Sequence, residues 1–400
     1  MRILFLTETI PAPLDSGGRI KTFHTLGILS REHEVVCHAF IRHEQQRARA
    51  ALLKDRCAEL VLHMHQRSAS GTLQDLARSA LSARAFTIVR HDNPTVRAAL
   101  LDEVRRRSYD VIYCDHLSTV QFARGLGLPI LYDAHNVEWQ LVERHGATLP
   151  WPIRPAAWLE ANRVKSEERR ACRDAVLTLA VSDRDAGELR RLAPGADIRT
   201  APIALDVQAL PFRPIPAQRA DVIFVGGLHW PPNATALEWF GSQVWPDVHR
   251  RSPEATLYCL GRASDVQRAR LEAVPGVSML GAIEDIEPWF QQARLMVVPL
   301  QSGSGMRVKI LDALARGVPV VTTRVGGEGI DAVPDTHLLV ADGPERFADA
   351  VLRLLADDRL AESLAHAGRH LALARYDLEA VRPVITKAVI DAERRQTAPR

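Results

Sequence analysis

The sequence lacks several features that would mark particular classes of protein. Its net charge of +3 is small for 400 residues, so charge alone does not indicate a nucleic-acid partner. No segment holds the roughly 18 uninterrupted apolar residues that a membrane span needs, and the apolar run before Thr7 is too short for a signal peptide. No Cys-x-x-Cys pair occurs, which argues against a zinc site or a disulfide framework. We therefore expect a cytoplasmic protein. The five scattered cysteines are Cys37, Cys57, Cys114, Cys172 and Cys259.

What the sequence does contain is a regular alternation of short apolar runs and longer amphipathic stretches. The run at 2–7 has no polar alternation, which is typical of a strand covered on both faces of a parallel sheet. Residues 19–32 are expected to be helical, and residues 44–107 mostly helical. The repeated strand–helix–strand order predicts an α/β protein with doubly wound parallel sheets. Further strands are expected at 33–40, 110–115, 128–135, 175–182, 221–228, 255–261, 277–283, 293–300 and 318–323.

The alternation breaks once, at residues 206–219. This stretch has three prolines and no clear periodicity, which indicates a linker. Four hundred residues are also too many for one ordinary core. We therefore predict an N-terminal domain over 1–205, a C-terminal domain over 220–375 and a last segment over 376–400.

The segment 299–323, PLQSGSGMRVKILDALARGVPVVTT, carries the strongest site signal. Gly303 and Gly305 lie in a turn between a strand and a helix, where successive backbone N–H groups can form an anion-binding nest. Arg307 in the entry turn offers a fork suited to phosphate oxygens, and Lys309 offers a point charge. Asp312 shares a helix face with Lys309 and could accept a ribose diol. Together they suggest a nucleotide-diphosphate site; the alternative is a solvated helix start.

This segment, followed by GGEGI at 326–330, resembles the donor site of glycosyltransferase family 4, whose members have the GT-B fold. FVGGLHWPPNATALEWF at 224–240 resembles the first strand and helix of the family's C-terminal domain. DSGGRIKTFHTLGILSREHEV at 15–35 is similar to its N-terminal glycine loop and helix. The resemblance covers nearly the whole chain. It implies two Rossmann-like domains with an inter-domain cleft, and a C-terminal helix that returns to the N-terminal domain.

The resemblance also implies an activity. Family members move a sugar from a nucleotide-diphosphate donor, held mainly by the C-terminal domain, to an acceptor held mainly by the N-terminal one. They retain the anomeric configuration and need neither metal nor cofactor. On this basis we expect a hexosyltransferase acting on a saccharide or lipid-linked acceptor in surface polysaccharide assembly. A nucleotide-sugar epimerase and a non-catalytic sugar-nucleotide-binding partner are the alternatives. A phosphorylase that uses pyridoxal phosphate is disfavoured, because no lysine has a Schiff-base context.

Two positions in the donor segment depart from the family pattern. The family's first glutamate, which contacts the donor sugar, falls at Ser304, and its second, the ribose ligand, falls at Asp312. Many members also carry an arginine and a lysine after the first strand of the C-terminal domain, where this chain has GGLHWPPNAT. We infer that Arg307 and Lys309 replace them. Met306 completes the expected donor loop.

Other candidates rest on the resemblance or on strand ends. Gly17 and Gly18 match the loop that approaches the donor phosphate, although a glycine pair is also common in tight turns. His135 is placed nearest the reaction, where it would polarise a sugar hydroxyl or move a proton. Its alternative role is to hold the loop by bonding to Asp133 or Glu138. Glu328 could contact the donor from its loop or begin a helix.

Three further features have less specific signals. Asp115 and His116, after a strand, are acceptor-site candidates that could instead cap the next helix. The Asp183-x-Asp185 spacing resembles a manganese site, but Ser182 followed by Asp185 is typical of a helix N-cap, and no metal is predicted. A basic region could contact the inner membrane surface or form a solvated face. Its arginines are Arg78, Arg84, Arg90, Arg97 and Arg105 to Arg107, with Asp92, Asp102 and Glu103 among them.

Overall fold

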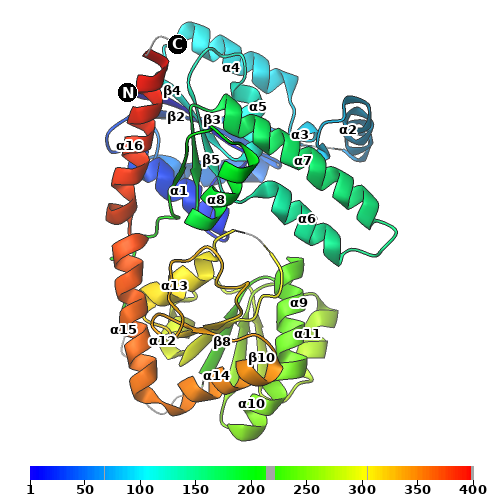
Figure 1. Cartoon of the computed structure of the whole chain (residues 1–400), viewed down its shortest axis with the longest axis vertical. Helices are drawn as coiled ribbons and strands as arrows, with labels where there is room; N and C mark the ends of the chain where they lie inside the picture. The colour runs from blue at the N-terminus through cyan, green and yellow to red at the C-terminus, as the bar shows by residue number, and fades with distance from the viewer. Residues whose placement is uncertain (67, 213–220, 304, 398–400) are drawn as a thin grey trace. The chain divides into compact units, whose positions relative to one another are not determined.

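The computed structural model describes residues 1–66, 68–212, 221–303 and 305–397 (Figure 1). It separates into two compact units. Unit 1 comprises Met1–Leu205 together with Leu378–Arg400, and unit 2 comprises Asp206–Asp377. The chain leaves unit 1 and re-enters it at one place, where the Leu378 N–H donates to the carbonyl of Leu205 over 2.9 Å. Of the predicted linker at 206–219, residues 213–219 lie outside the described residues, and residues 206–212 form neither helix nor strand.

Unit 1 is built on a seven-stranded sheet in the order β3-β2-β1-β4-β5-β6-β7. Every neighbouring pair of strands is parallel. Side chains of the inner strands are buried on both faces, which explains why their sequences show no polar alternation. The strands are β1 (Arg2–Thr7), β2 (Glu34–Ile41), β3 (Glu59–Met64), β4 (Val111–Asp115), β5 (Ile130–Ala134), β6 (Leu177–Ala180) and β7 (Ile198–Thr200).

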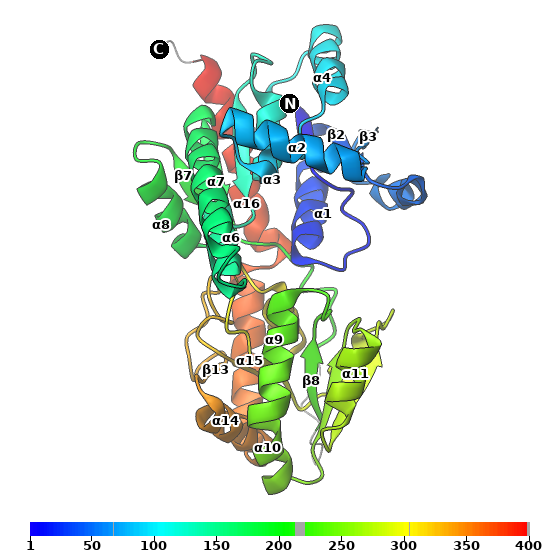
Figure 2. The ribbon, with the colours of Figure 1, turned by 90° about the vertical axis from the view of Figure 1, so that its right-hand side faces the viewer.

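Helices cover both faces of this sheet. On one face α1 (Gly17–Leu29) and α16 (Leu378–Thr397) pack on the strands, with Leu26 and Val389 in the same apolar cluster as Phe5. The other face is covered by helices that include α7, whose Val164 is fully buried. Figure 2 shows α2 and α7 on the side turned toward the viewer. The remaining helices are η1 (Glu44–Leu53), α2 (Ala69–Ser82), α3 (Phe86–Val89), α4 (Pro94–Arg106), α5 (Leu117–Ala123), α6 (Glu138–Thr148), α7 (Arg154–Asp174) and α8 (Asp183–Leu192).

Unit 2 has the same architecture, with a six-stranded parallel sheet in the order β10-β9-β8-β11-β12-β13. Its core combines Trp245, Phe240 and Phe347 from the helices with Phe224 and Val297 from the sheet. The strands are β8 (Asp221–Val225), β9 (Thr256–Leu260), β10 (Val277–Gly281), β11 (Leu295–Val298), β12 (Val320–Thr322) and β13 (Leu339–Val340). The helices are α9 (Pro231–Trp239), η2 (Phe240–Val244), α10 (Trp245–Arg251), α11 (Asp265–Glu272), α12 (Glu287–Gln292), α13 (Val308–Arg316), α14 (Pro344–Ala356) and α15 (Asp358–Arg375).

The α/β class and the two doubly wound parallel sheets are as the sequence predicts, with one correction. Residues 44–107 were expected to be mostly helical, yet β3 lies within them. It runs beside β2 at the edge of the sheet, and its side chains are only partly buried. A short edge strand of this kind has neither the continuous apolar run of an inner strand nor a long periodic pattern.

Candidate active site

Each sheet has a point where the order of its strands reverses, and ligands of parallel sheets bind beyond the strand ends at such points. In unit 1 the reversal lies between β2-β1 and β4-β5; in unit 2 it lies between β9-β8 and β11-β12. The segments that follow β1 and β4 form the candidate position in unit 1. The segments that follow β8 and β11 form the candidate position in unit 2. The residues predicted for the site divide between these two positions.

In unit 2 the loop after β11 contains the two glycines of the predicted anion-binding turn. Gly303 and Gly305 have φ angles of +125° and +76°, values that side chains other than glycine rarely adopt. Helix α13 begins at Val308, with Arg307 as its N-cap residue, and ends at Gly317 in the left-handed conformation. Arg307 thus lies in the entry turn, as expected. Ser304 lies outside the described residues.

Lys309 reaches from α13 to the turn that follows β8. Its ammonium donates to Oδ1 of Asn233 over 3.0 Å and lies 5.3 Å from the centre of the Phe224 ring. A Cβ on Gly226 would stand only 2.8 Å from this ammonium, so a glycine at the end of β8 makes room for it. Burial, and then repulsion from Arg307, lowers the pKa of Lys309 to about 7.

Arg307 is buried and turns back over its own loop. Its Nη1 donates to the carbonyl of Gly305, and a Cβ on Gly303 would stand 2.9 Å from Nη2. The two predicted cations therefore lie within the fold, beside the glycine turns, and not in bulk solvent. The two positive charges repel each other, which contributes to the lowered pKa of Lys309. An anion bound beside them would stabilise the charged form of both side chains.

Asp312 lies one turn further along α13 and has a protein partner that the sequence did not reveal. Its carboxylate forms an ion pair with Arg316, which also donates to Oε2 of Glu287 over 2.8 Å. Burial raises the pKa of Asp312, while Arg316 opposes that rise. Any ribose bound by Asp312 would share the carboxylate with Arg316.

Two more predicted donor residues lie near this loop in the sequence but have different surroundings. Met306 is buried. Glu328 is partly buried in a turn after β12, and its N–H lies 3.4 Å from the carbonyl of Val325. The alternative that Glu328 begins a helix is wrong, because the next helix, α14, starts at Pro344.

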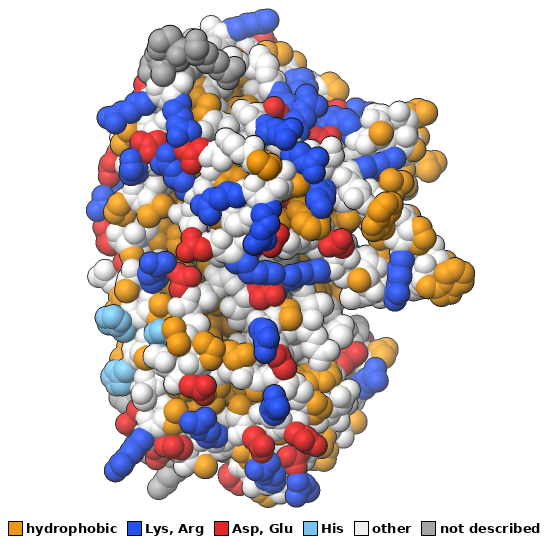
Figure 3. Space-filling view, in the orientation of Figure 1, with side chains coloured by type: hydrophobic (Ala, Val, Ile, Leu, Met, Phe, Trp, Pro, Cys, Tyr) orange, Lys and Arg blue, Asp and Glu red, His pale blue; other side chains and the backbone are white. Residues whose placement is uncertain are grey.

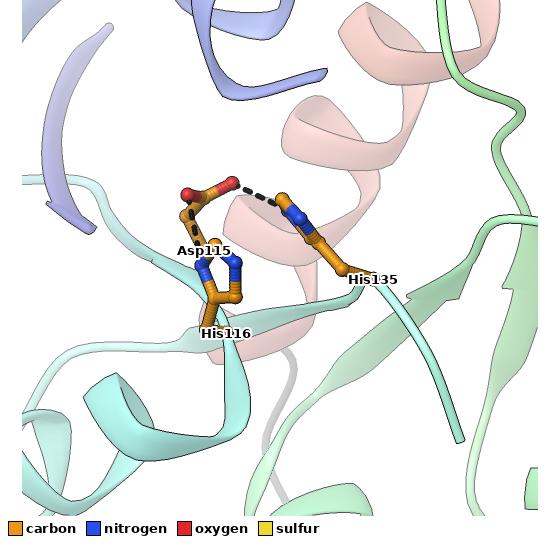
Figure 4. Close-up of side chains that lie close together, drawn as sticks. All are labelled: Asp115, His116 and His135. Atoms are coloured by element: carbon orange, nitrogen blue, oxygen red, sulfur yellow. Dashed lines mark hydrogen bonds and ion pairs between the residues drawn. The ribbon is translucent and has the colours of Figure 1, made fainter. Parts of the chain in front are cut away.

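In unit 1 the ends of β4 and β5 bring a carboxylate and two imidazoles together (Figure 4). Nε2 of His135 lies 2.8 Å from Oδ1 of Asp115, and Nδ1 of His116 lies 3.2 Å from Oδ2 of the same carboxylate. The His116 and His135 ring centres are 3.9 Å apart. The carboxylate also accepts from Thr7 over 2.8 Å and from Thr22 over 2.7 Å. Asp115 is therefore the partner of His135, in place of the expected Asp133 or Glu138.

The hydrogen bond to Asp115 fixes what the other nitrogen of His135 can do. Burial, and then the charge of Lys21, lowers the pKa of His135 to about 3, so the ring is neutral. With the Nε2 proton donated to Asp115, Nδ1 carries a lone pair. Among the described residues Nδ1 is buried without a hydrogen-bond partner, and a Cβ on Gly18 would stand 3.6 Å from it. The ring can therefore accept a hydrogen bond from a hydroxyl group.

Gly17 and Gly18 form the first turn of α1, and the structure brings Gly18 to His135 and His116. A Cβ at Gly18 would lie 3.8 Å from Nε2 of His116. Asp133, at the end of β5, does not bond to His135. It forms a buried ion pair with Lys21 of α1 and accepts from the Tyr113 hydroxyl over 2.6 Å. These buried bonds hold α1 against the strand ends.

His116 itself has an unusual backbone. Its φ of +144° and ψ of +156° lie in a region that is populated almost only by glycine. It occupies the N-cap position of α5, but its side chain makes no capping hydrogen bond, so the expectation that it simply caps the helix is wrong. The strained backbone aims the ring at Asp115 and His135 instead.

One group of described residues has donor atoms close enough to hold a metal ion: Asp115, His116 and His135, whose ligand atoms lie within 4.8 Å of one another. The hydrogen bonds described above already use one nitrogen of His135 and both carboxylate oxygens. Asp183 and Asp185 do not form such a site. The Asp185 N–H donates to the hydroxyl of Ser182 over 3.1 Å, which confirms the predicted helix cap.

Sequence reasoning missed four residues that shape these positions: Lys21, Asn233, Arg316 and Glu8. Glu8 follows β1, accepts from Ser118 over 2.7 Å and lies 4.0 Å from Nε2 of His116. A signal existed for Glu8, because it is a polar residue directly after a buried strand. The signal for Lys21 was weaker, because it is only a charged residue among the apolar residues of α1. Arg316 carried a signal as well, because it lies four residues after Asp312 on the same predicted helix. Asn233 had none, because its role depends on contact with a distant segment.

Comparison with known proteins gives one matching family model, described as glycosyl transferases group 1, over residues 219–357. An uncharacterized 44.6 kDa protein in the cps region of Klebsiella pneumoniae is 26% identical over 140 residues, which span 33% of this chain and 36% of that protein. A GDP-mannose-dependent alpha-(1-6)-phosphatidylinositol monomannoside mannosyltransferase of Mycobacterium tuberculosis is 24% identical over 352 residues, covering 81% of this chain and 88% of that protein.

Solved structures give a likeness over almost the whole chain. Sucrose-phosphate synthase from Thermosynechococcus elongatus matches with a TM-score of 0.72 at 16% identity, covering 97% of this chain and 98% of that one. HepE from Anabaena, in complex with UDP and glucose, matches with a TM-score of 0.69 at 15% identity, covering 98% of this chain and 99% of that one. At these identities the likeness establishes the shared fold.

Proposed function

Because the chain is a glycosyltransferase with the GT-B fold, and its unit 2 matches the group 1 model, we propose that it uses a nucleotide-diphosphate sugar. Unit 2 binds the donor, and unit 1 binds a saccharide or lipid-linked acceptor in surface polysaccharide assembly in the cytoplasm. The names of two similar proteins include GDP-mannose and UDP with glucose, which supports a nucleotide-sugar donor and leaves the base open.

The observation that carries the proposal is the position of Lys309. Its ammonium lies at the turn after β8, where the family places cations that this chain lacks in sequence. With Arg307 and the N–H groups of Gly303 and Gly305, it can neutralise the charge that develops on a departing diphosphate. These groups supply the role that a metal ion has in other transferases, so we propose that transfer is metal-independent and uses no cofactor.

In unit 1, His135 is proposed to act on a hydroxyl group. A neutral ring whose Nε2 is held by Asp115 presents Nδ1 as an acceptor above Gly18. It can orient a sugar hydroxyl without requiring a change in its own charge. No side chain is required as a nucleophile, which fits transfer with retention in which the leaving phosphate helps to deprotonate the acceptor.

Two measurements test the proposal. Thermal-shift and calorimetric titration with UDP, GDP, ADP and their sugars should identify one base that binds, with the affinity lowered in Lys309→Met. With that donor, His135→Ala should lower turnover by about a hundredfold or more and change donor affinity little.

Unchanged turnover in His135→Ala would refute its placement at the reaction. Release of an epimerised nucleotide sugar in the absence of any acceptor would show that the protein is an epimerase and not a transferase. Tight binding without transfer or slow hydrolysis would indicate a binding protein.

A further inference from the structure

Helix α2 exposes its leucines to solvent, and the two residues that it buries are polar. Leu73, Leu76 and Leu81 are 69%, 48% and 90% exposed, whereas Asp75 and Ser79 are 2% and 3% exposed. Ser79 donates to the carbonyl of Arg84 over 2.7 Å and accepts from Arg163 of α7 over 3.3 Å. A helix on the surface of a protein in water has the opposite arrangement. The outer face of α2 is therefore suited to contact something other than water.

A second apolar projection lies at the tip of the α6–α7 hairpin. The two helices meet closely at Gly146, where a Cβ would stand 2.8 Å from the Cβ of Ala157. Beyond this contact Trp151 is 80% exposed and Trp158 is 64% exposed, with Ile153 and Leu159 also exposed. Two largely exposed tryptophans at the end of a tightly packed hairpin are unusual on a surface that contacts only water.

The two projections lie along the same edge of unit 1. In Figure 1 α2 and the α6–α7 tip both extend to the right, and the space-filling view in the same orientation shows hydrophobic side chains gathered there (Figure 3). Figure 2 turns this edge toward the viewer and shows α2 and α7 on it. We call this the α2–hairpin surface, formed by Leu73, Leu76, Leu81, Trp151, Ile153 and Trp158.

The exposed charges around the α2–hairpin surface are mostly positive. Residues 75–92 and 143–160 contain five arginines and four acidic residues, but among the charged side chains of these segments that are exposed, three are arginines and one is a glutamate. Arg78 pairs with Asp92 over 2.7 Å and Arg84 with Glu167 over 2.9 Å, which anchors the surface to the rest of unit 1. The other predicted basic positions contribute differently. Arg97 shares Asp92 with Arg78, and Arg105 and Arg107 pair with Asp102 and Glu59.

We propose that the α2–hairpin surface docks unit 1 on an anionic phospholipid bilayer. Leucines can enter the acyl region, tryptophans favour the interface, and arginines pair with lipid phosphates. A second copy of the chain fits less well, since a symmetric contact through this surface would set arginines against arginines. Within the described residues, no helix has the length and apolar character to cross a membrane, so docking is peripheral. The inference stands on this surface alone and does not depend on the transfer reaction.

Sedimentation of the full chain with vesicles tests the proposal. The wild type should bind vesicles containing phosphatidylglycerol and bind pure phosphatidylcholine much less, and added salt should weaken binding. Trp151→Ser/Trp158→Ser should lower the vesicle partition coefficient on the order of tenfold for each aromatic side chain removed. Leu81→Ser should lower it less. Brominated lipids should quench the fluorescence of the wild type and not that of the double variant.

Leu52→Ser and Val266→Ser are the matched controls, because these side chains are 60% and 78% exposed outside the α2–hairpin surface. They should bind vesicles as the wild type does, and thermal unfolding should show that all variants are folded. Equal binding to both kinds of vesicle, or unchanged binding by the double variant, would overturn the proposal. So would a concentration-dependent dimer that the double variant abolishes, without vesicle binding, since it would assign the surface to a second copy.

Discussion

The ammonium of Lys309 and the side-chain oxygen of Asn233 are 3.0 Å apart, although 76 residues separate them in the sequence. This contact joins the start of α13 to the start of α9 at the end of strand β8. It places a single positive charge where the chain reverses its strand order in unit 2.

Replacing Lys309 with methionine should weaken binding of a nucleoside diphosphate. Loss of a charged hydrogen bond to phosphate costs about 1.5–3 kcal/mol, or about tenfold to a hundredfold in the dissociation constant. Isothermal titration calorimetry with the preferred nucleotide measures the change. Arg353→Met is the control, because Arg353 is an exposed cation of the same unit. Equal affinities for the wild type and Lys309→Met would remove Lys309 from the donor site.

The stability of the ligand-free protein should also depend on pH through Lys309. Its pKa falls from 10.5 to about 7 on folding, so between these values the unfolded chain holds more protons. Stability contributed by this group therefore rises with pH across that window and is lost as pH falls through about 7. Between pH 6 and pH 9 the free energy of unfolding of the wild type should rise by about 1–3 kcal/mol relative to that of Lys309→Met, whose side chain does not titrate. Urea unfolding at both pH values measures it, and a constant difference would contradict the lowered pKa.

Gly18→Ala should separate folding from function in unit 1. The added methyl would make ordinary contacts, 3.6 Å from Nδ1 of His135 and 3.8 Å from Nε2 of His116, so the variant should be about as stable as the wild type. It would occupy the space in front of Nδ1, and turnover should fall about tenfold or more, as expected when the hydrogen-bond acceptor that orients a reacting hydroxyl is blocked.

Gly187→Ala is the matched glycine control, since a Cβ there meets nothing within 4 Å. In helix α8 it should stabilise the protein by about 0.5–1 kcal/mol and leave turnover unchanged. Full activity in Gly18→Ala would show that no ligand group approaches His135 from the side of Gly18.

Lys21→Met should destabilise unit 1 strongly. Lys21 and Asp133 are 3% and 0% exposed, and removing one partner leaves the other charge buried, at a cost of about 3–5 kcal/mol. Chemical denaturation followed by circular dichroism measures the loss. Lys387→Met removes an exposed ion pair with Asp391 and should change stability by less than about 1 kcal/mol. Similar losses in the two variants would contradict the argument from burial.

Sequence reasoning succeeded where the signal was local. The apolar runs of β1 and β8, the N-cap at Ser182 and the C-cap at Gly317 follow from neighbouring residues, and the structure confirms them. It failed where a distant segment decides the outcome. Asp312 has Arg316 on its own helix, but the geometry of that pair depends on Glu287 from α12. Likewise, the choice of Asp115 over Asp133 as the partner of His135 depends on Lys21, which binds Asp133.

The hydrogen bond between Leu378 and Leu205 has a consequence for synthesis of the chain. Unit 2 is encoded inside unit 1, so the ribosome makes the last helix of unit 1 after all of unit 2. Helix α16 covers part of the sheet face on which Phe5 and Leu131 lie. Until α16 emerges from the ribosome, the apolar side chains that it covers stay exposed to water. A fragment ending near residue 205 is therefore expected to aggregate, whereas a fragment spanning 206–377 retains every strand of its own sheet.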